Sequence, residues 1–203
     1  MPLNFGYIGI GKETTAGTAV APSAFFRATS PAQMSARVEF YEIPGIDAFG
    51  PVGVVPTQLS GEGDIEVVVQ PRSIGHLLAG LLGLPNTSGG TAPYTHTFTP
   101  KNSAPTYTLE AQDGVAVHRL VGSRVSSLEF THSADGVLLA RASLVSMNRT
   151  TTGTPATGTY EADLFTVGQV TVSVGGTALQ GRTTAVSVSL QFPKTPRHTV
   201  ESV

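Results

Sequence analysis

The chain has 203 residues, no cysteine and a net charge of −2, and charged residues make up only 13% of it. This share is about half of the roughly 25% that is usual in soluble domains. The composition excludes a strongly basic nucleic-acid-binding surface, and the lack of thiols excludes disulfides, thiolate catalysis and thiolate metal ligands.

The length predicts a single domain over residues 1–203, and 23 glycines with 14 prolines favour a turn-rich β domain. Residues 1–30 predict an extended N-terminal arm, since they show little periodicity, although residues 7–10 could form a short strand. The start lacks the pattern of a signal peptide, and the longest apolar run, 77–84, is shorter than the ~20 residues that span a bilayer. We therefore expect a soluble protein, made in a cytoplasm, without a membrane partner.

Residues 34–43 alternate with the period of a strand. Residues 44–60 hold three prolines and three glycines, which predicts a long loop without a regular element. A loop of this length is usually functional or disordered, and a disordered loop would rarely be so apolar. We therefore expect this loop to be buried against something through five residues: Ile46, Phe49, Val52, Val54 and Val55.

Residues 61–70 predict a strand with two unlike faces. One face carries Ile65, Val67 and Val69, and the other carries Glu62, Asp64 and Glu66. A helix follows at about 72–83, where Gly83 ends it and Ser73 is a plausible N-cap. Its apolar positions share one helical face that we expect to be core: Ile74, Leu77, Leu78, Leu81 and Leu82.

The rest of the chain predicts further strands at 94–99, 105–112, 116–121, 123–132, 136–147, 168–174 and 183–192. In the last strand, Ser187, Ser189 and Gln191 form a polar face. Residues 86–93 and 149–160 read as linker and loop, and 193–203 as a C-terminal tail. The whole predicts a mainly antiparallel β fold with one inserted helix.

Motifs that would carry enzyme chemistry are weak. Residues 6–12 have the G-x-x-x-x-G-K spacing of a phosphate-binding loop, but Glu13 stands where a Mg²⁺-binding Ser or Thr is needed. Nucleotide binding through Gly6–Lys12 is thus a distant alternative. His118 with Asp113 and a serine could form a triad, but no nucleophile elbow supports it. We expect no enzyme, no cofactor and no metal.

Several segments occur in an order that resembles the major tail tube proteins of long-tailed, siphophage-type bacteriophages. They are YIGIGKETTAGTAVAPSAFFRATS at 7–30, GDIEVVVQP at 63–71, RSIGHLLAGLLG at 72–83, YTHTFTP at 94–100, PTYTLE at 105–110 and VGSRVSSLEF at 121–130. The resemblance covers most of residues 5–147 and is looser over 150–203. It implies a tail-tube fold, an antiparallel β-sandwich or partial barrel.

This resemblance implies a structural virion protein that self-assembles into stacked hexameric rings. Sheets would join edge to edge around a channel, and DNA would pass without specific binding. The implied partners are other copies of the chain, a tape measure protein and a tail terminator, and the implied location is the virion tail, assembled in the host cytoplasm. The alternatives are the inner tube of a contractile tail, or another virion β-module such as a terminator or decoration protein.

The carboxylates on the strand at 61–70 allow two interpretations in such an assembly. They form either a solvated outer face or the wall of a channel for a polyanion. We expect the channel wall, because the apolar face of the strand requires packed protein and period 2 turns the other face away from it. The expected lumen-facing residues are Glu62, Asp64 and Glu66, with Ser187, Ser189 and Gln191 as further candidates. The apolar loop at 44–60 is then expected to contact the neighbouring ring.

Overall fold

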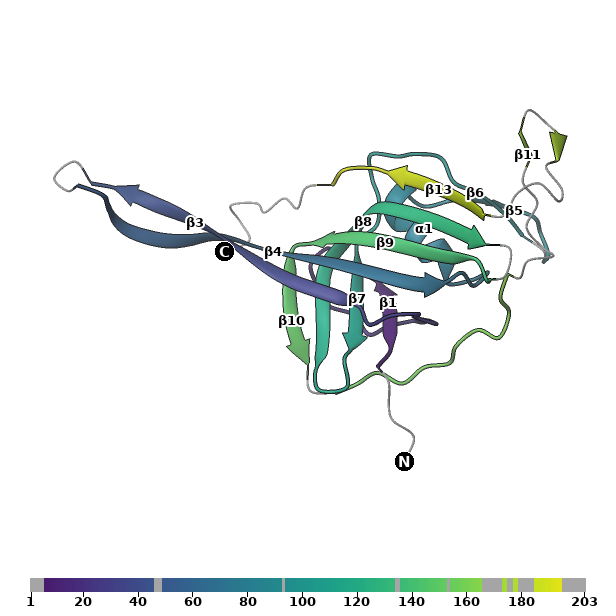
Figure 1. Cartoon of the computed structure of the whole chain (residues 1–203), viewed down its shortest axis with the longest axis horizontal. Helices are drawn as coiled ribbons and strands as arrows, with labels where there is room; N and C mark the ends of the chain where they lie inside the picture. Colours follow the sequence, from purple (N-terminus) through teal and green to yellow (C-terminus); the bar gives the residue numbers. More distant parts are fainter. Residues whose placement is uncertain are drawn as a thin grey trace.

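The computed structural model describes residues 6–45, 49–92, 94–133, 136–152, 154–165, 173–174, 177–178 and 185–194. Figure 1 shows a body of antiparallel strands with one helix and a long hairpin that projects from it. The mainly β fold with one helix is as predicted. The elements are β1 Ile8–Lys12, β2 Ala24–Phe26, β3 Gln33–Pro44, β4 Pro51–Val68, α1 Ile74–Leu82, β5 Asn86–Ser88, β6 Thr95–Thr97, β7 Tyr107–Gln112, β8 Val117–Ser133, β9 Leu139–Ser146, β10 Asn148–Thr152, β11 Ser173–Val174, β12 Thr177–Ala178 and β13 Ala185–Gln191.

The long strand β8 belongs to both halves of the main sheet. Its first part pairs with β7 and β10, which gives leaf A with the order β2-β1-β7-β8-β10. Its second part pairs with β9 and β13, which gives leaf B with the order β13-β8-β9-β4-β3. Gly122 lies between the two parts with φ of +67°, and a Cβ there would meet the Met147 sulfur at 2.7 Å. A glycine is therefore required where β8 passes from one leaf to the other.

The core joins apolar residues of both leaves to the helix. Leu77 and Leu81 of α1 are fully buried, while Ile74, Leu78 and Leu82 are half-buried and pack against the core. Ser73 stands at the N-cap position, but its side chain makes no capping hydrogen bond. The strand residues of this core include Ile8, Ile10, Ile65, Val67, Leu109, Leu120, Leu128 and Leu144.

The extended N-terminal arm predicted over residues 1–30 is wrong at residues 8–12 and 24–26, which form strands of the body, and the first of these strands lies close to the short strand considered at 7–10. Strand β1 is an interior strand that pairs with β2 on one side and β7 on the other. Its apolar residues Ile8 and Ile10 are buried in the core. In this five-residue strand, IGIGK, the apolar residues alternate with glycines, so the sequence shows only a weak alternation of apolar and polar side chains. Of the predicted C-terminal tail, residues 195–203 lie outside the described residues, and 193–194 form no strand.

The long loop predicted at 44–60 is also wrong, because β4 begins at Pro51 and pairs with β3 back to Pro44. The prolines occupy places that tolerate them: Pro44 faces Pro51 beside the turn, and Pro56 sits at a register shift. Proline is tolerated at strand ends and bulges, where a missing N–H breaks no regular ladder. Residues 38–44 and 51–59 form a two-stranded ribbon, which we call the arm, that extends from the body (Figure 1).

Candidate interaction surfaces

Leaf B presents one polar face on the side opposite its apolar core residues. Cross-strand register places Glu66 beside Arg141, Arg141 beside Glu129, and Glu129 beside Ser189. A second row runs Asp64, Ser143, Ser127 and Gln191. Directly paired residues lie on the same face of a sheet. The carboxylates of β4 and the polar residues of β13, more than 100 positions apart in sequence, therefore share one surface, which we call the polar face.

Hydrogen bonds hold the carboxylates of the polar face. Glu66 accepts hydrogen bonds from Thr29 Oγ1 at 2.5 Å and from Arg141 Nη2 at 2.6 Å, and both lower its pKa, Thr29 more strongly. Ser143 Oγ donates to Asp64 at 2.6 Å, and Ser187 Oγ donates to Glu129 at 2.6 Å.

In the described part of the chain, no cation lies within ion-pair distance of Glu62 or Asp64. At the end nearest the arm, however, Glu62 shares a shallow hollow with Arg37, Glu39 and Lys194. The polar face is therefore acidic, but nearby arginine and lysine side chains offset part of its negative charge. It is not the uniformly negative wall that the sequence of β4 alone suggests.

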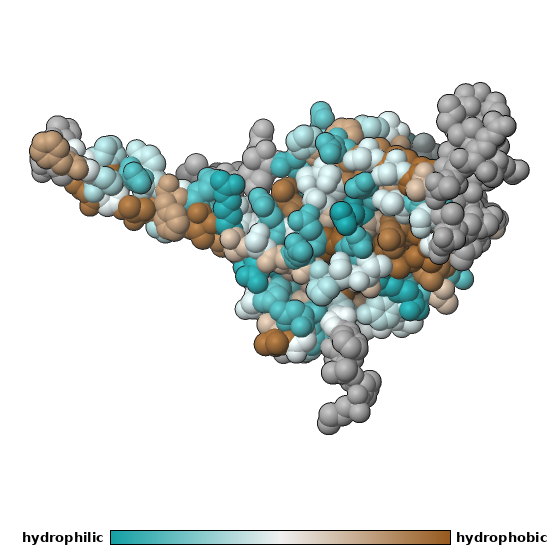
Figure 2. All heavy atoms as spheres, in the orientation of Figure 1, coloured by the Kyte–Doolittle hydropathy of each residue, from teal (hydrophilic) through white to brown (hydrophobic). Residues whose placement is uncertain are grey.

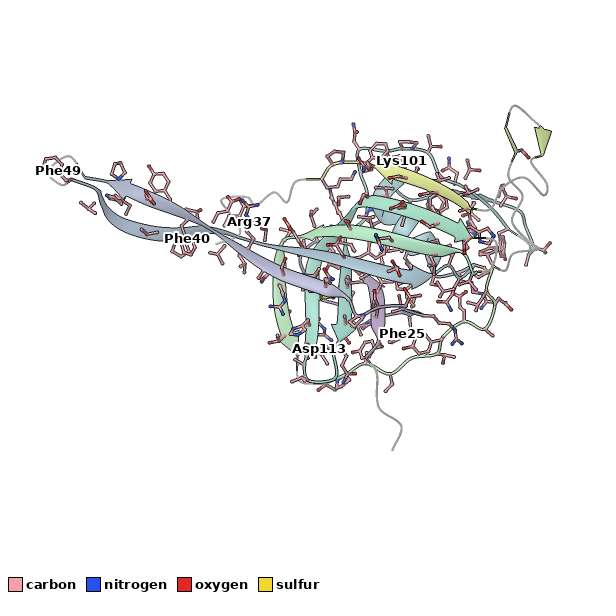
Figure 3. All side chains as sticks on the ribbon, viewed as in Figure 1. Phe25, Arg37, Phe40, Phe49, Lys101 and Asp113 are labelled. Atoms are coloured by element: carbon pink, nitrogen blue, oxygen red, sulfur yellow. The ribbon has the colours of Figure 1, made fainter. Side chains whose placement is uncertain are left out.

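The arm carries exposed apolar side chains on both of its surfaces. Register places Val38 with Leu59 and Phe40 with Pro56 on the surface that continues the core side of leaf B, and Val54 lies on the same surface. Phe40 is 63% exposed and Val54 is 57% exposed. Figure 2 shows brown, hydrophobic spheres along the arm, and Figure 3 shows Phe40 midway along it and Phe49 at its tip.

The other residues expected in an apolar contact segment also belong to the β3–β4 hairpin. Val52, Val55 and Phe49 are exposed, and Ile46 lies outside the described residues. The opposite surface of the arm adds Tyr41 and Ile43, which are also exposed. Within the described structure of the single chain, nothing covers these side chains. Exposed apolar surfaces of this kind are typical of protein–protein contacts, membrane-binding surfaces and ligand-binding grooves.

The sequence-suggested chemical sites take structural roles. Residues 8–12 pair with β7, and residues 8–10 pair with β2 as well, so this segment is a strand of the sheet and not a phosphate-binding loop. His118 lies 3.2 Å from Asp113 and 3.0 Å from Arg149, so both ring nitrogens are occupied by groups that are not nucleophiles. Backbone N–H donors of Ala116 and Val115 lower the pKa of Asp113 to about 2, which fits a turn residue at the hairpin end labelled in Figure 3.

Two kinds of site are absent from the part of the chain that the structure describes. Among its residues, no group of three His, Asp or Glu side chains could hold a metal ion. No helix of that part of the chain is long and apolar enough to cross a membrane.

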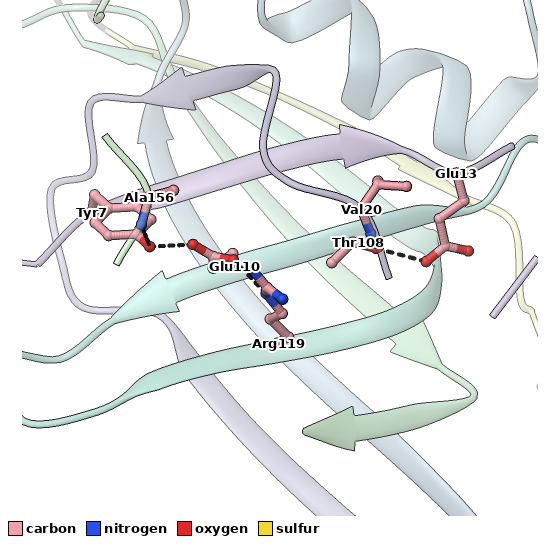
Figure 4. A network of polar contacts seen from close by, with 7 residues as sticks. All are labelled: Tyr7, Glu13, Val20, Thr108, Glu110, Arg119 and Ala156. Carbon is pink, nitrogen blue, oxygen red and sulfur yellow. Dashed lines mark hydrogen bonds and ion pairs between the residues drawn. The ribbon is translucent and has the colours of Figure 1, made fainter. Parts of the chain in front are cut away.

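Sequence reasoning missed a pair of buried carboxylates, drawn in Figure 4. Glu110 is fully buried, accepts the hydroxyl of Tyr7 and pairs with Arg119, while Ala156 N–H donates to the Tyr7 oxygen at 2.6 Å. Burial, followed by the hydrogen bond to Glu110, raises the pKa of Tyr7 to about 12. In the sequence Glu110 stands between the apolar residues Leu109 and Ala111, which is the pattern of a strand residue that faces solvent, so its burial was not predicted.

The second carboxylate, Glu13, is 6% exposed and organises the chain after β1. It accepts hydrogen bonds from Thr108 Oγ1 at 2.8 Å, Gly122 N–H at 2.8 Å and Gly17 N–H at 2.9 Å. Thr108 Oγ1 in turn accepts a hydrogen bond from Val20 N–H at 3.1 Å (Figure 4). The glutamate of the GKET segment is thus a structural anchor between β1, β7 and the bend of β8.

The chain matches a known protein family but none of the curated proteins compared with it. A family model described as "Phage tail tube protein" matches residues 6–192, which covers most of the chain and all of its described strands. By this match, the chain belongs to the phage tail tube protein family, whose members are structural components of the virion tail.

Proposed function

We propose that this chain polymerises into stacked hexameric rings, which form the hollow tail tube through which phage DNA passes. The observation that carries the proposal is the division of leaf B into two unlike sides. One side bears the core and packs against α1, while the other is a polar face built from four adjacent strands. A sheet of this kind suits the wall of a water-filled channel.

The chemistry of the polar face fits the passage of DNA without specific binding. Free Lys or Arg side chains on a channel wall would bind phosphates and release counterions, and such contacts would hold the DNA. Here Arg141 is held by Glu66, so its charge is compensated, and Arg124 lies in the row of Val145 and the carboxylate Glu62. Asp64, Glu62 and the serines repel phosphate or contact it weakly. We assign Glu62, Asp64, Glu66, Ser187, Ser189 and Gln191 to the lumen.

The arm supplies the contact between rings in this proposal. Its apolar residues are exposed in the single chain, and a hairpin that projects beyond the body can reach a copy in the next ring. The tape measure protein and the tail terminator are the further partners that the resemblance implies. Assembly takes place in the host cytoplasm, and the product is the virion tail.

The test is negative-stain electron microscopy of the purified protein over a range of concentrations. We expect tubes with a central hole, built from six-fold rings, and their length should increase with protein concentration. Single rings or trimers that never stack would contradict the proposal and favour another virion β-module.

A further inference from the structure

Leaf B ends in two open edges. In its strand order, β3 and β13 lie at opposite ends, and in the described structure each has a partner on one side only. Soluble proteins usually protect such edges with charges, prolines or bulges. The seven residues of β13, AVSVSLQ, contain no charge and no proline. Residues 33–39 of β3, which include the base of the arm, contain no proline, and Arg37 and Glu39 have opposite charges.

The two edges also match in the way their side chains are distributed. On β3, Ser35 belongs to the polar face and Val38 to the core side; on β13, Ser189 and Val188 divide in the same way. Val38 is 41% exposed and Val188 is 49% exposed, although both point toward the core side. Placing the two edges together would extend the polar face without a break and would bury both valines.

Strand direction determines how these edges can meet. Every pairing within leaf B is antiparallel, from β3 through β4, β9 and β8 to β13. Direction therefore reverses four times, and β3 and β13 run the same way. If two copies related by rotation about a tube axis continue one sheet, the strands at their junction are parallel.

We propose that β3 of one copy pairs with β13 of the next in a parallel junction, and that this junction closes the ring. The inference rests on the proposed tube and adds which edges meet and in which direction. Because the two edges differ, the contact is heterologous, and such contacts form closed rings when the rotation closes. Evenly spaced but slanted hydrogen bonds, as in other parallel pairs, would connect the copies.

Pairs of engineered cysteines test the junction, since the natural chain has none. Nine double variants combine Ser35→Cys, Arg37→Cys or Glu39→Cys with Ser187→Cys, Ser189→Cys or Gln191→Cys, and each is oxidised after assembly. Within one copy the edges are separated by four strand spacings, about 19 Å. A disulfide needs Cα atoms within about 7 Å, so any bond that forms joins two copies.

In a parallel junction, a cysteine nearer the C-terminal end of β3 should link most efficiently to a cysteine nearer the C-terminal end of β13. This trend holds for any register. We expect ladders of linked chains that end at six for the favoured pairs. The other pairs should form no more dimer than the six single-cysteine variants, which are the controls.

Each other outcome overturns a defined part of the proposal. The opposite trend would show an antiparallel junction. Strong linkage in a single-cysteine variant would show like edges meeting. Well-formed tubes without linkage for any pair would reject these edges and leave the proposed function standing. Failure of the cysteine-free protein to form tubes would reject the proposed function and the junction together.

Discussion

Glu13 shows how one buried residue can hold several segments together. Its carboxylate satisfies the buried Gly122 N–H and the Thr108 hydroxyl, as well as Gly17 N–H. Leaving a buried donor unpaired costs ~1–3 kcal/mol. We predict that Glu13→Ala lowers the free energy of unfolding by about 2–4 kcal/mol, because two buried donors lose their acceptor. Urea titration measures the change.

The matched control is Glu62→Ala, which removes a carboxylate from the exposed polar face. Its effect should stay within about 0.5 kcal/mol, as for most surface changes. Equal losses for the two variants would show that the hydrogen bonds of Glu13 contribute little to stability.

Two tyrosines predict how stability depends on alkaline pH. Burial is the main cause that raises the pKa of Tyr7 and of Tyr107 from 10.0 to about 12. Between pH 10 and pH 12 the unfolded chain has lost phenolic protons that the folded chain keeps. The free energy of unfolding must therefore fall as pH rises through this window, by up to about 1.4 kcal/mol per pH unit for each tyrosine.

Tyr107→Phe keeps the aromatic ring in the core and removes one of the two titrating groups. Urea titrations of both proteins across this pH range should give a shallower decline for the variant. An identical pH dependence in the two proteins would show that Tyr107 keeps an ordinary pKa in the folded state.

At the scale of single elements, the two glycines of α1 lie in opposite environments. A Cβ at Gly75 would meet no atom within 4 Å, whereas a Cβ at Gly80 would lie 2.9 Å from Val125 Cγ2. Alanine gains about 0.8–1.0 kcal/mol over glycine in helix propensity. We predict that Gly75→Ala raises the thermal midpoint and that Gly80→Ala lowers it, because the helix must move away from β8. A higher midpoint for Gly80→Ala would mean that this contact adjusts without cost.

The arm is the element on which assembly depends in the proposed tube. We predict that Phe40→Thr combined with Val54→Thr leaves the monomer folded, because threonine suits strands and both side chains are exposed. Tube formation in electron micrographs should be lost, since the apolar contact is removed. Glu42→Thr, on the same surface of the arm, is the matched control and should assemble. Long tubes from the double variant would exclude this surface from the ring contact.

Strand alternation explains which elements were predictable. The strand with Ile65 and Val67 alternates cleanly, and the helix around Leu77 repeats its leucines at helical spacing, so their periods indicated them. The strands of the arm were missed because proline ordinarily argues against a strand. Pro56 lies at a register shift, where the regular hydrogen-bond ladder is interrupted and a missing N–H is tolerated. Glu110 was missed because alternation shows which residues share a face, but not that residues near Ala156 cover that face.

At the scale of the whole molecule, the charges of the polar face should affect DNA passage more than assembly. We predict that Glu62→Lys with Asp64→Lys still permits tubes but slows DNA ejection, because the new cations contact phosphates. The defect should diminish at high salt, since salt screens and displaces such contacts. The neutral pair Glu62→Gln and Asp64→Asn is the control and should eject DNA normally. Modification of these positions in assembled tubes by a reagent too bulky to enter would place them outside the lumen.

The pairing of β1 with β7 has a consequence for synthesis of the chain on the ribosome. Tyr7 contacts Glu110, a separation of 103 residues, so leaf A cannot begin to close before β7 has been translated. At ~5–20 residues per second, the first strand waits about 5–20 s for β7, its second partner. During that interval the β3–β4 hairpin, whose strands are neighbours in the chain, is already complete with its apolar arm. A nascent subunit therefore carries its proposed ring contact before it has a finished body, and slower translation lengthens the exposure of that contact to premature association.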